Sequence, residues 1–278
     1  MNLFTDVESL RQTLSTVKNS KSIAFVPTMG ALHDGHLALV DYAKKHCDYV
    51  IVSIFVNPTQ FGPNEDFSTY PRTLENDSKK LELLGVDALF CPSQEVIYPE
   101  KDPLVTVSIP KWQTRYCGKT RPMFFQGVCA VVLRLFNIIT PNIAIFGQKD
   151  FQQYKIIQQL TKELFLPISI IGLPTKREEN GLALSSRNTY LNNTERIQAS
   201  TIYSSLNYAK NQFYNNQLST SSQLTDLIKN HIHTSISIDY CVVIDSESLD
   251  EIQVLQAGQR ILFAGYLGKT RLIDNIEL

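Results

Sequence analysis

Long apolar runs are absent from this sequence. None approaches the roughly 20 residues that a membrane-spanning helix needs. The N-terminus carries Asp6 and Glu8 where a secretory signal would place basic residues before a short apolar core. We therefore expect no membrane segment and no secretory signal, and we predict a cytoplasmic protein.

An excess of either charge is also absent. The chain has 26 Lys and Arg against 27 Asp and Glu, which gives a formal net charge of −1. Proteins that bind duplex nucleic acid depend on clustered basic residues, so we expect no nucleic-acid partner. A small phosphate-binding pocket remains compatible with this balance.

Cysteines are few and scattered. The five lie at positions 47, 91, 117, 129 and 241, with no CxxC pair. Zinc sites and disulfide frameworks need tighter spacing, so we expect reduced thiols. By contrast, hydrophobic residues make up 43% of the 278 positions, which excludes intrinsic disorder and suits one large domain or two smaller ones.

Strand-like and helix-like segments alternate in the first 175 residues. The strands are expected at 22–27, 49–56, 87–90, 142–147 and 167–174, and the helices at 36–46, 71–84, 127–139 and 150–164. This order predicts a doubly wound parallel sheet. Ligands of such folds bind beyond the carboxyl ends of the strands.

The character of the sequence changes after residue 175. Residues 194–233 are polar with helical character, and they include an Asn/Gln/Ser-rich stretch near 211–223. Strand-like segments follow at 237–245 and 260–267. We predict a first domain over 1–175 and a smaller α+β domain over 176–278.

A glycine- and histidine-rich turn lies between the first predicted strand and the first predicted helix. It comprises Met29, Gly30, Ala31, Leu32, His33, Asp34, Gly35 and His36. Glycines let a phosphate approach the backbone, and the N–H groups of a helix start attract anions. The turn therefore predicts a nucleotide site. A metal held through the HxxH spacing and a pair of ordinary loop histidines are the alternatives, although no third metal ligand stands nearby.

A second phosphate-directed segment follows the last strand of the first domain. It comprises Leu184, Ser185, Ser186 and Arg187. Two hydroxyls and a guanidinium in sequence suit a loop that closes on a triphosphate, whereas a helix cap beside a surface arginine is the alternative. An HxGH-like turn early in a chain and a basic, serine-rich loop late in it are typical of class I nucleotidyltransferases.

A third segment, at the strand end near residue 147, is Gly147, Gln148, Lys149 and Asp150. The lysine can neutralise phosphate charge. The aspartate can accept hydrogen bonds from a ribose or cap the following helix.

Uncharged amides stand at two strand ends. Asn57 and Gln60 follow one strand, and Gln153 lies at the start of a predicted helix. An amide both donates and accepts hydrogen bonds, which suits a small hydroxy acid. Turn formation around Pro58 is the alternative for Asn57.

Together these segments resemble the pantoate–β-alanine ligase family, almost end to end. The segments that carry the resemblance are PTMGALHDGHLALV (27–40), SIFVNPTQFGPNEDFSTYPRT (53–73), RPMFFQGVCAVVLRLFNI (121–138), FGQKDFQQ (146–153), REENGLALSSRNTYL (177–191) and RLIDN (271–275). The resemblance implies a Rossmann-like first domain, a smaller C-terminal lid and a homodimer. It also implies an ATP- and Mg²⁺-dependent enzyme that joins (R)-pantoate to β-alanine through a pantoyl adenylate, releasing AMP and pyrophosphate.

The resemblance further implies roles for individual residues. Catalysis falls to His33, His36 and Lys149, with His36 described as a proton donor. Asn57, Gln60 and Gln153 would bind pantoate and β-alanine. ATP would be bound by the segments 29–36, 147–150 and 184–187 and by Lys176, and no protein ligand of Mg²⁺ is implied.

Some positions depart from the family pattern. Phe124 stands where histidine is usual and Gln148 where glutamate is usual, and Asp34 and Asn180 are milder changes. None alters Lys149 or the paired histidines. Two other functions stay open. One is a nucleotidyltransferase for a phosphorylated small molecule, against which the uncharged glutamines count, and the other is a nucleotide-binding regulatory module without catalysis.

Overall fold

Residues 1–63, 65–100 and 105–278 are described by the computed structural model, in which the chain divides into two units. Unit 1 comprises Met1–Gln148 and Gln153–Leu173, and unit 2 comprises Lys149–Gln152 and Pro174–Leu278. Asn64, within the family-like segment 53–73, lies outside the described residues. The short segment Lys149–Gln152 thus packs with the C-terminal part of the chain.

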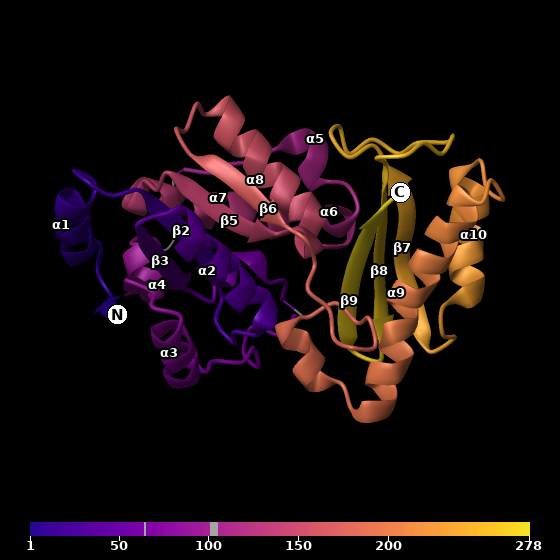
Figure 1. The fold of residues 1–278 in the computed structure, drawn as a ribbon, viewed down its shortest axis with the longest axis horizontal. Helices are drawn as coiled ribbons and strands as arrows, with labels where there is room; N and C mark the ends of the chain where they lie inside the picture. Colours follow the sequence, from indigo (N-terminus) through magenta and orange to yellow (C-terminus); the bar gives the residue numbers. More distant parts are fainter. Residues whose placement is uncertain (64, 101–104) are drawn as a thin grey trace. The chain divides into compact units, whose positions relative to one another are not determined.

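Unit 1 is built on a six-stranded parallel sheet with the order β1-β4-β3-β2-β5-β6, of which Figure 1 labels β2, β3, β5 and β6. Its strands are β1 (Asn2–Phe4), β2 (Ile23–Thr28), β3 (Tyr49–Ile54), β4 (Ala88–Phe90), β5 (Ile143–Gly147) and β6 (Ser169–Leu173). The strand order reverses between β2 and β5, and ligands of doubly wound folds bind where this happens. The predicted doubly wound sheet is confirmed.

Helices cover both faces of this sheet. Residues Ile23–Val26 of β2 are completely buried. Ala24 and Val26 pack in one cluster with α2, whereas Phe25 meets Phe136 of α7 edge-on, with ring centroids 6.3 Å apart. Because successive side chains of a strand point to opposite faces, α2 covers one face and α7 the other.

The helices of the first 173 residues include several of a single turn. They are α1 (Val7–Val17), α2 (Asp34–His46), η1 (Pro58–Gln60), α3 (Leu74–Leu83), α4 (Gln94–Ile97), α5 (Pro110–Gln113), α6 (Cys117–Thr120), α7 (Phe124–Ile139), η2 (Gln148–Asp150) and α8 (Phe151–Glu163). Three of them, α2, η1 and η2, directly follow or closely follow the carboxyl ends of β2, β3 and β5. They therefore carry three of the predicted ligand-binding segments.

Unit 2 contains a three-stranded antiparallel sheet with the order β7-β8-β9. Its elements are η3 (Ser186–Tyr190), α9 (Asn193–Tyr214), α10 (Ser221–His231), β7 (Ile236–Ile244), β8 (Arg260–Leu267) and β9 (Thr270–Glu277). Leu206 of α9, Ile228 of α10 and Phe263 of β8 belong to one buried cluster. The predicted α+β character of this region is confirmed, and the Asn/Gln/Ser-rich stretch contains the turn between α9 and α10.

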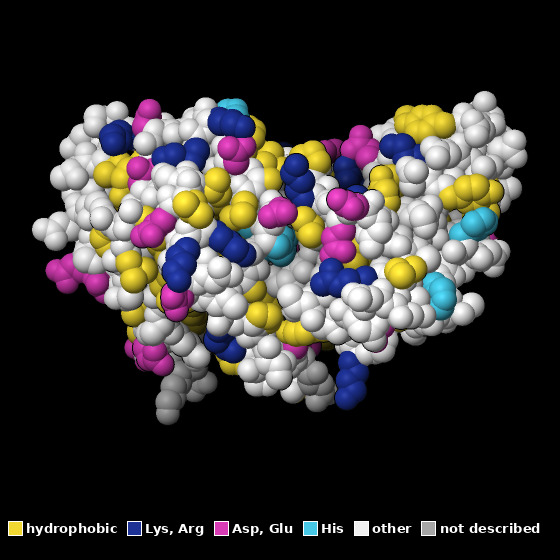
Figure 2. All heavy atoms as spheres, turned by 60° about the horizontal axis from the view of Figure 1, so that its bottom comes forward, with side chains coloured by type: hydrophobic (Ala, Val, Ile, Leu, Met, Phe, Trp, Pro, Cys, Tyr) yellow, Lys and Arg dark blue, Asp and Glu magenta, His cyan; other side chains and the backbone are white. Residues whose placement is uncertain are grey.

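Among the described residues, no helix combines the length and the apolarity that crossing a bilayer requires. On the face drawn in Figure 2, basic and acidic side chains are intermixed rather than gathered by sign. All five cysteines lie outside disulfide bonds, and their reduced state stays a prediction. Burial raises the pKa of Cys91 to about 11 and that of Cys129 to about 12, so neither is a thiolate nucleophile at neutral pH.

Candidate functional site

The turn after β2 has an unusual backbone. Gly30 has a φ of 81° and Ala31 a φ of 50°, and the left-handed region is costly for any residue but glycine. A Cβ on Gly30 would also lie 3.0 Å from Cγ2 of Ile54 and 3.3 Å from Oδ2 of Asp77. The conformation therefore requires glycine at position 30 and outside support at position 31.

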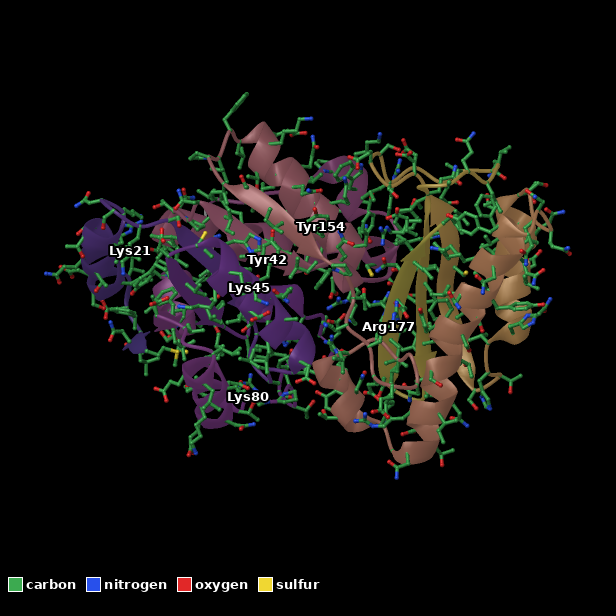
Figure 3. All side chains as sticks on the ribbon, in the orientation of Figure 1. Lys21, Tyr42, Lys45, Lys80, Tyr154 and Arg177 are labelled. Atoms are coloured by element: carbon green, nitrogen blue, oxygen red, sulfur yellow. The ribbon has the colours of Figure 1, made fainter. Side chains whose placement is uncertain are left out.

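Helix α3 supplies that support. The carboxylate of Asp77 is 1% exposed and accepts the N–H groups of Ala31 and Leu32 at 2.8 and 2.9 Å. Nζ of Lys80 donates to the Leu32 carbonyl at 2.6 Å, and Figure 3 shows Lys80 on this helix. Thr73 also donates to Asp77. Sequence reasoning missed these residues, although Thr73, Asp77 and Lys80 have the spacing of one helix face.

Most backbone N–H groups of the turn therefore already have partners within unit 1. Gly30 donates to Oγ1 of Thr28 at 3.2 Å, Ala31 and Leu32 donate to Asp77, and Gly35 donates to Nδ1 of His33 at 3.1 Å. An anion would have to displace these partners to reach the N–H groups. The sequence predicted that backbone N–H groups of this turn bind a phosphate. Since most of these groups already have partners, the imidazoles are better candidates for that contact.

The two histidines form the cap of α2. Nδ1 of His33 accepts from Gly35, and Nδ1 of His36 accepts from the backbone N–H of His33 at 3.4 Å. The ring centroids are 4.1 Å apart. Since Nδ1 is the acceptor in each ring, the neutral imidazole carries its proton on Nε2. A second proton on Nδ1 would point at another N–H group and break the cap. Each histidine is therefore arranged as a neutral Nε2–H donor.

Asn57 is a structural amide that places Gln60. Asn57 is 1% exposed, and its Oδ1 accepts from Tyr98 and Thr59. Its Nδ2 donates to the Gly127 carbonyl at 3.2 Å and to Oε1 of Gln60 at 3.1 Å. Burial raises the pKa of Tyr98, so its hydroxyl stays protonated and able to donate. With these partners Asn57 caps η1, and its contact with the substrates stays a prediction.

Gln60 joins two of the predicted segments. Its Nε2 lies 3.0 Å from Sδ of Met29, so the amide touches the start of the nucleotide turn. The Gln60 carbonyl accepts from Arg121, which also forms an ion pair with Glu65. The Arg121 guanidinium lies 3.7 Å from the centroid of the Phe124 ring. Phe124, the departure from the family pattern, thus packs against the residue that holds Gln60.

The end of β5 carries Gln148, whose Nε2 lies 3.4 Å from the Gly172 carbonyl of β6. Gln153, in the first turn of α8, is half-buried. Both belong to unit 1, and Gly147 has no atom within 4 Å of its would-be Cβ. Gln148, which stands where glutamate is usual, thus adds no charge at this strand end, and its amide donates to the neighbouring strand β6.

Unit 2 holds the remaining candidates. Lys149 lies 3.7 Å from Asp150, and its side chain is 18% exposed. The segment 184–187 follows a short hairpin, in which the backbone N–H of Leu184 donates to the carbonyl of the exposed Lys176 at 2.9 Å and Arg177 pairs with Ala183.

The serine-rich loop itself is tightly held. Ser185 caps η3 by accepting from Arg187 at 3.3 Å, and Ser186 is buried. Asn188, also buried, donates to Glu178 and to the Ala183 carbonyl. The loop thus presents Ser185 and Arg187 from a fixed backbone.

No cluster of metal ligands is found among the described residues, since none of their His, Cys, Asp or Glu side chains forms a group of three suited to a metal ion. The metal alternative for the HxxH spacing has no third ligand there. The histidine pair fits hydrogen bonding to an anion better.

Over almost its whole length, the chain is similar to known proteins of one family. A family model described as "Pantoate-beta-alanine ligase" matches residues 2–277. A pantothenate synthetase from Psychrobacter cryohalolentis is 46% identical over 276 residues, covering 97% of this chain and 95% of that protein. The crystal structure of pantothenate synthetase from Thermus thermophilus matches with a TM-score of 0.94 at 38% identity, covering 100% of this chain and 99% of that one. The structure of pantoate-β-alanine ligase from Francisella tularensis, complexed with β,γ ATP and β-alanine, has a TM-score of 0.82 at 39% identity, with coverages of 100% and 97%.

Proposed function

Because the chain belongs to the pantoate–β-alanine ligase family over residues 2–277, we infer that it condenses (R)-pantoate with β-alanine to pantothenate, converting ATP to AMP and pyrophosphate. The observation that carries this inference is the match over almost the whole chain, at 46% identity to a curated relative.

The reaction runs in two steps. The pantoate carboxylate attacks the α-phosphorus of ATP, and pyrophosphate leaves. The amine of β-alanine then attacks the acyl carbon of the pantoyl adenylate, loses a proton, and expels AMP. A free carboxylate is a poor acyl donor, and adenylation gives it a good leaving group. The protein contributes positioning and stabilisation of the phosphate charge rather than a covalent bond.

In unit 1, the nucleotide turn 29–36 receives the adenosine and the α-phosphate. The Nε2–H groups of His33 and His36 donate to phosphate oxygens, which their cap geometry supports. Gln60 and Gln153 hold the hydroxyls of pantoate, and Gln60 also meets β-alanine. Neutral amides suit this task, because a cation gripping the carboxylate would weaken the nucleophile.

In unit 2, Lys149, Ser185, Ser186 and Arg187 bind the β- and γ-phosphates, and Asp150 and the Lys176 backbone complete the ATP contacts. Mg²⁺ supplies further positive charge to the phosphates. When bound with ATP, the ion would be held mainly by phosphate oxygens and water, and no protein ligand is assigned to it.

The resemblance extends the proposal to the assembly and the location. We expect a homodimer in the cytoplasm. Light scattering on the purified protein tests the first point, with a mass near twice 31.5 kDa expected and a mass near 31.5 kDa opposing it.

A substrate panel tests the activity. The purified protein is incubated with ATP, Mg²⁺, β-alanine and one carboxylic acid at a time, and AMP and the amide product are measured. Pantoate should give equal amounts of AMP and pantothenate. The assignment would be overturned if AMP is released only with a phosphorylated acid, or if no acid of the panel leads to AMP release.

A further inference from the structure

Two buried polar residues of β9 lie in the family-like segment RLIDN (271–275), in which no site residue is predicted. Asp274 and Asn275 are each 4% exposed. Neighbouring residues of a strand point to opposite faces, so the two side chains leave β9 on different sides. Each of them reaches a segment that carries phosphate-binding candidates, and every contact lies within unit 2.

Asn275 binds the lysine segment. Its Oδ1 accepts from Nη1 of Arg260 at 2.7 Å, and its Nδ2 donates to the Lys149 carbonyl at 2.9 Å. Arg260 can only donate, so the atom facing it must be oxygen, and this fixes the orientation of the amide. The Arg260 guanidinium also lies 4.1 Å from the centroid of the Phe151 ring. β9 thus holds the backbone of Lys149 through Asn275, and β8 contacts the same segment through the ring of Phe151.

Asp274 binds the base of the serine-rich loop. Its two carboxylate oxygens accept from Arg177 at 2.6 and 2.9 Å, a bidentate pair. Arg177 in turn donates to the Gly181 carbonyl at 3.1 Å and stacks on Tyr203 at 3.8 Å. Figure 3 shows Arg177 beside the sheet of unit 2. Because Arg177 lies in the hairpin that leads into Leu184, this contact anchors the segment 184–187.

We propose that Asp274 and Asn275 are positioning residues that fix Lys149 and the loop Ser185–Arg187 at a set separation, as a preformed cationic group for the triphosphate. This inference rests on the proposed function for its ligand. A single strand holds both segments through buried hydrogen bonds, so neither segment needs to be ordered when ATP binds, which lowers the entropic cost of the adenylation step.

Asn275→Asp tests the contact with Lys149. The new carboxylate keeps the acceptor for Arg260, but it places an acceptor against the Lys149 carbonyl. We expect the thermal midpoint to fall, because a buried hydrogen bond is lost. Pantoate-dependent exchange of pyrophosphate into ATP should fall roughly 10- to 100-fold, as small misplacements of reacting groups can do. Backbone hydrogen exchange should rise in 148–153 and stay unchanged in 177–187.

Two further variants complete the test. Asp274→Asn should raise hydrogen exchange in 177–187 and leave 148–153 unchanged. Arg271→Leu is the control, because Arg271 lies on β9 like the two proposed residues and forms an ion pair with Asp239 of β7, which belongs to neither segment. It should lower the thermal midpoint without changing the Km for ATP.

Three results would overturn the proposal. They are wild-type pyrophosphate exchange in Asn275→Asp, wild-type hydrogen exchange in 148–153 of that variant, and the same segment-specific changes in Arg271→Leu. If the wild-type protein itself shows no pyrophosphate exchange, the proposed function fails, while the hydrogen-exchange comparison still decides whether β9 anchors the two segments.

Discussion

The nucleotide turn uses the Nδ1 atoms of its two histidines for structure. His33 accepts from Gly35 and His36 accepts from the His33 backbone, which places the proton of each neutral ring on Nε2. Extra protons would break both bonds at the start of α2. This cap geometry supports the proposed hydrogen bonds to phosphate, and the role of His36 as a proton donor stays a prediction.

Substitution of His36 distinguishes the two roles. A glutamine amide can reach the place of Nε2 and donate there, whereas an asparagine amide reaches only the place of Nδ1. We expect His36→Asn to lose about 10²- to 10³-fold in adenylation rate, as for a missing preorganised donor, and His36→Gln to lose clearly less. Single-turnover formation of the adenylate measures both. Equal losses would instead favour a proton-transfer role, since neither amide can supply a proton.

At the scale of elements, α3 holds the nucleotide turn in place. Asp77 lies 46 residues along the chain from Ala31, yet its buried carboxylate accepts from Ala31 and Leu32. This contact stabilises the left-handed conformation of Ala31, and it occupies the N–H groups of Ala31 and Leu32 as donors to Asp77. α3 thus stabilises the conformation of the turn 29–36.

Asp77→Asn tests that role. One half of the new amide would be a donor facing an N–H donor, so we expect the free energy of unfolding to fall by roughly 1–3 kcal/mol and the Km for ATP to rise. Denaturant titration and steady-state kinetics measure the two effects. Glu75→Gln on the same helix is the control, because its pair with Lys79 is exposed and contributes little. An unchanged ATP Km together with a large loss of stability would limit Asp77 to folding.

Close packing between α7 and η1 fixes the position of Gln60. A Cβ on Gly127 would lie 2.2 Å from the Thr59 carbonyl oxygen and 2.9 Å from the backbone nitrogen of Gln60. Gly127→Ala must therefore push η1 away from α7. We expect the Km for pantoate to rise about tenfold or more, given the sensitivity of bound geometry to small displacements, with ATP binding nearly unchanged.

Gly62→Ala is the matched control for this prediction. Among the described residues, the atoms nearest to its Cβ would belong to the Glu65 side chain, the first at 3.6 Å, which is an ordinary contact. Calorimetric titration with pantoate and with ATP compares the variants. Unaltered pantoate binding in Gly127→Ala would show that Gln60 does not contact this substrate.

At the scale of the whole molecule, local patterns predicted the strands around the site but not the contacts that shape it. The apolar runs of β2 and β3 and the helical spacing of α2 are visible in the sequence. β9 was missed because Asp274 and Asn275 interrupt its pattern, and their buried partners are distant in sequence. β1 has only three residues, which is too short for a periodic signal. Asp77 was missed because a carboxylate on a polar helix carries no local sign of burial.

The candidate residues are divided between the two units. Unit 1 carries the histidine turn and the substrate amides, and unit 2 carries Lys149 and the serine-rich loop. The chain passes between the units at 148/149, 152/153 and 173/174. Lys149 is therefore grouped by packing with Arg187 rather than with its sequence neighbour Gln148, which the sequence alone did not indicate.

In the proposed function, pantoate is activated as an adenylate before β-alanine reacts. Exchange of labelled pyrophosphate into ATP measures this step, with the purified wild-type protein, ATP and Mg²⁺. Exchange should appear when pantoate is added and should not require β-alanine, because the first step is complete and reversible without the amine. Exchange that begins only after β-alanine is added, or that does not depend on pantoate, would show that no pantoyl adenylate forms before the amine reacts.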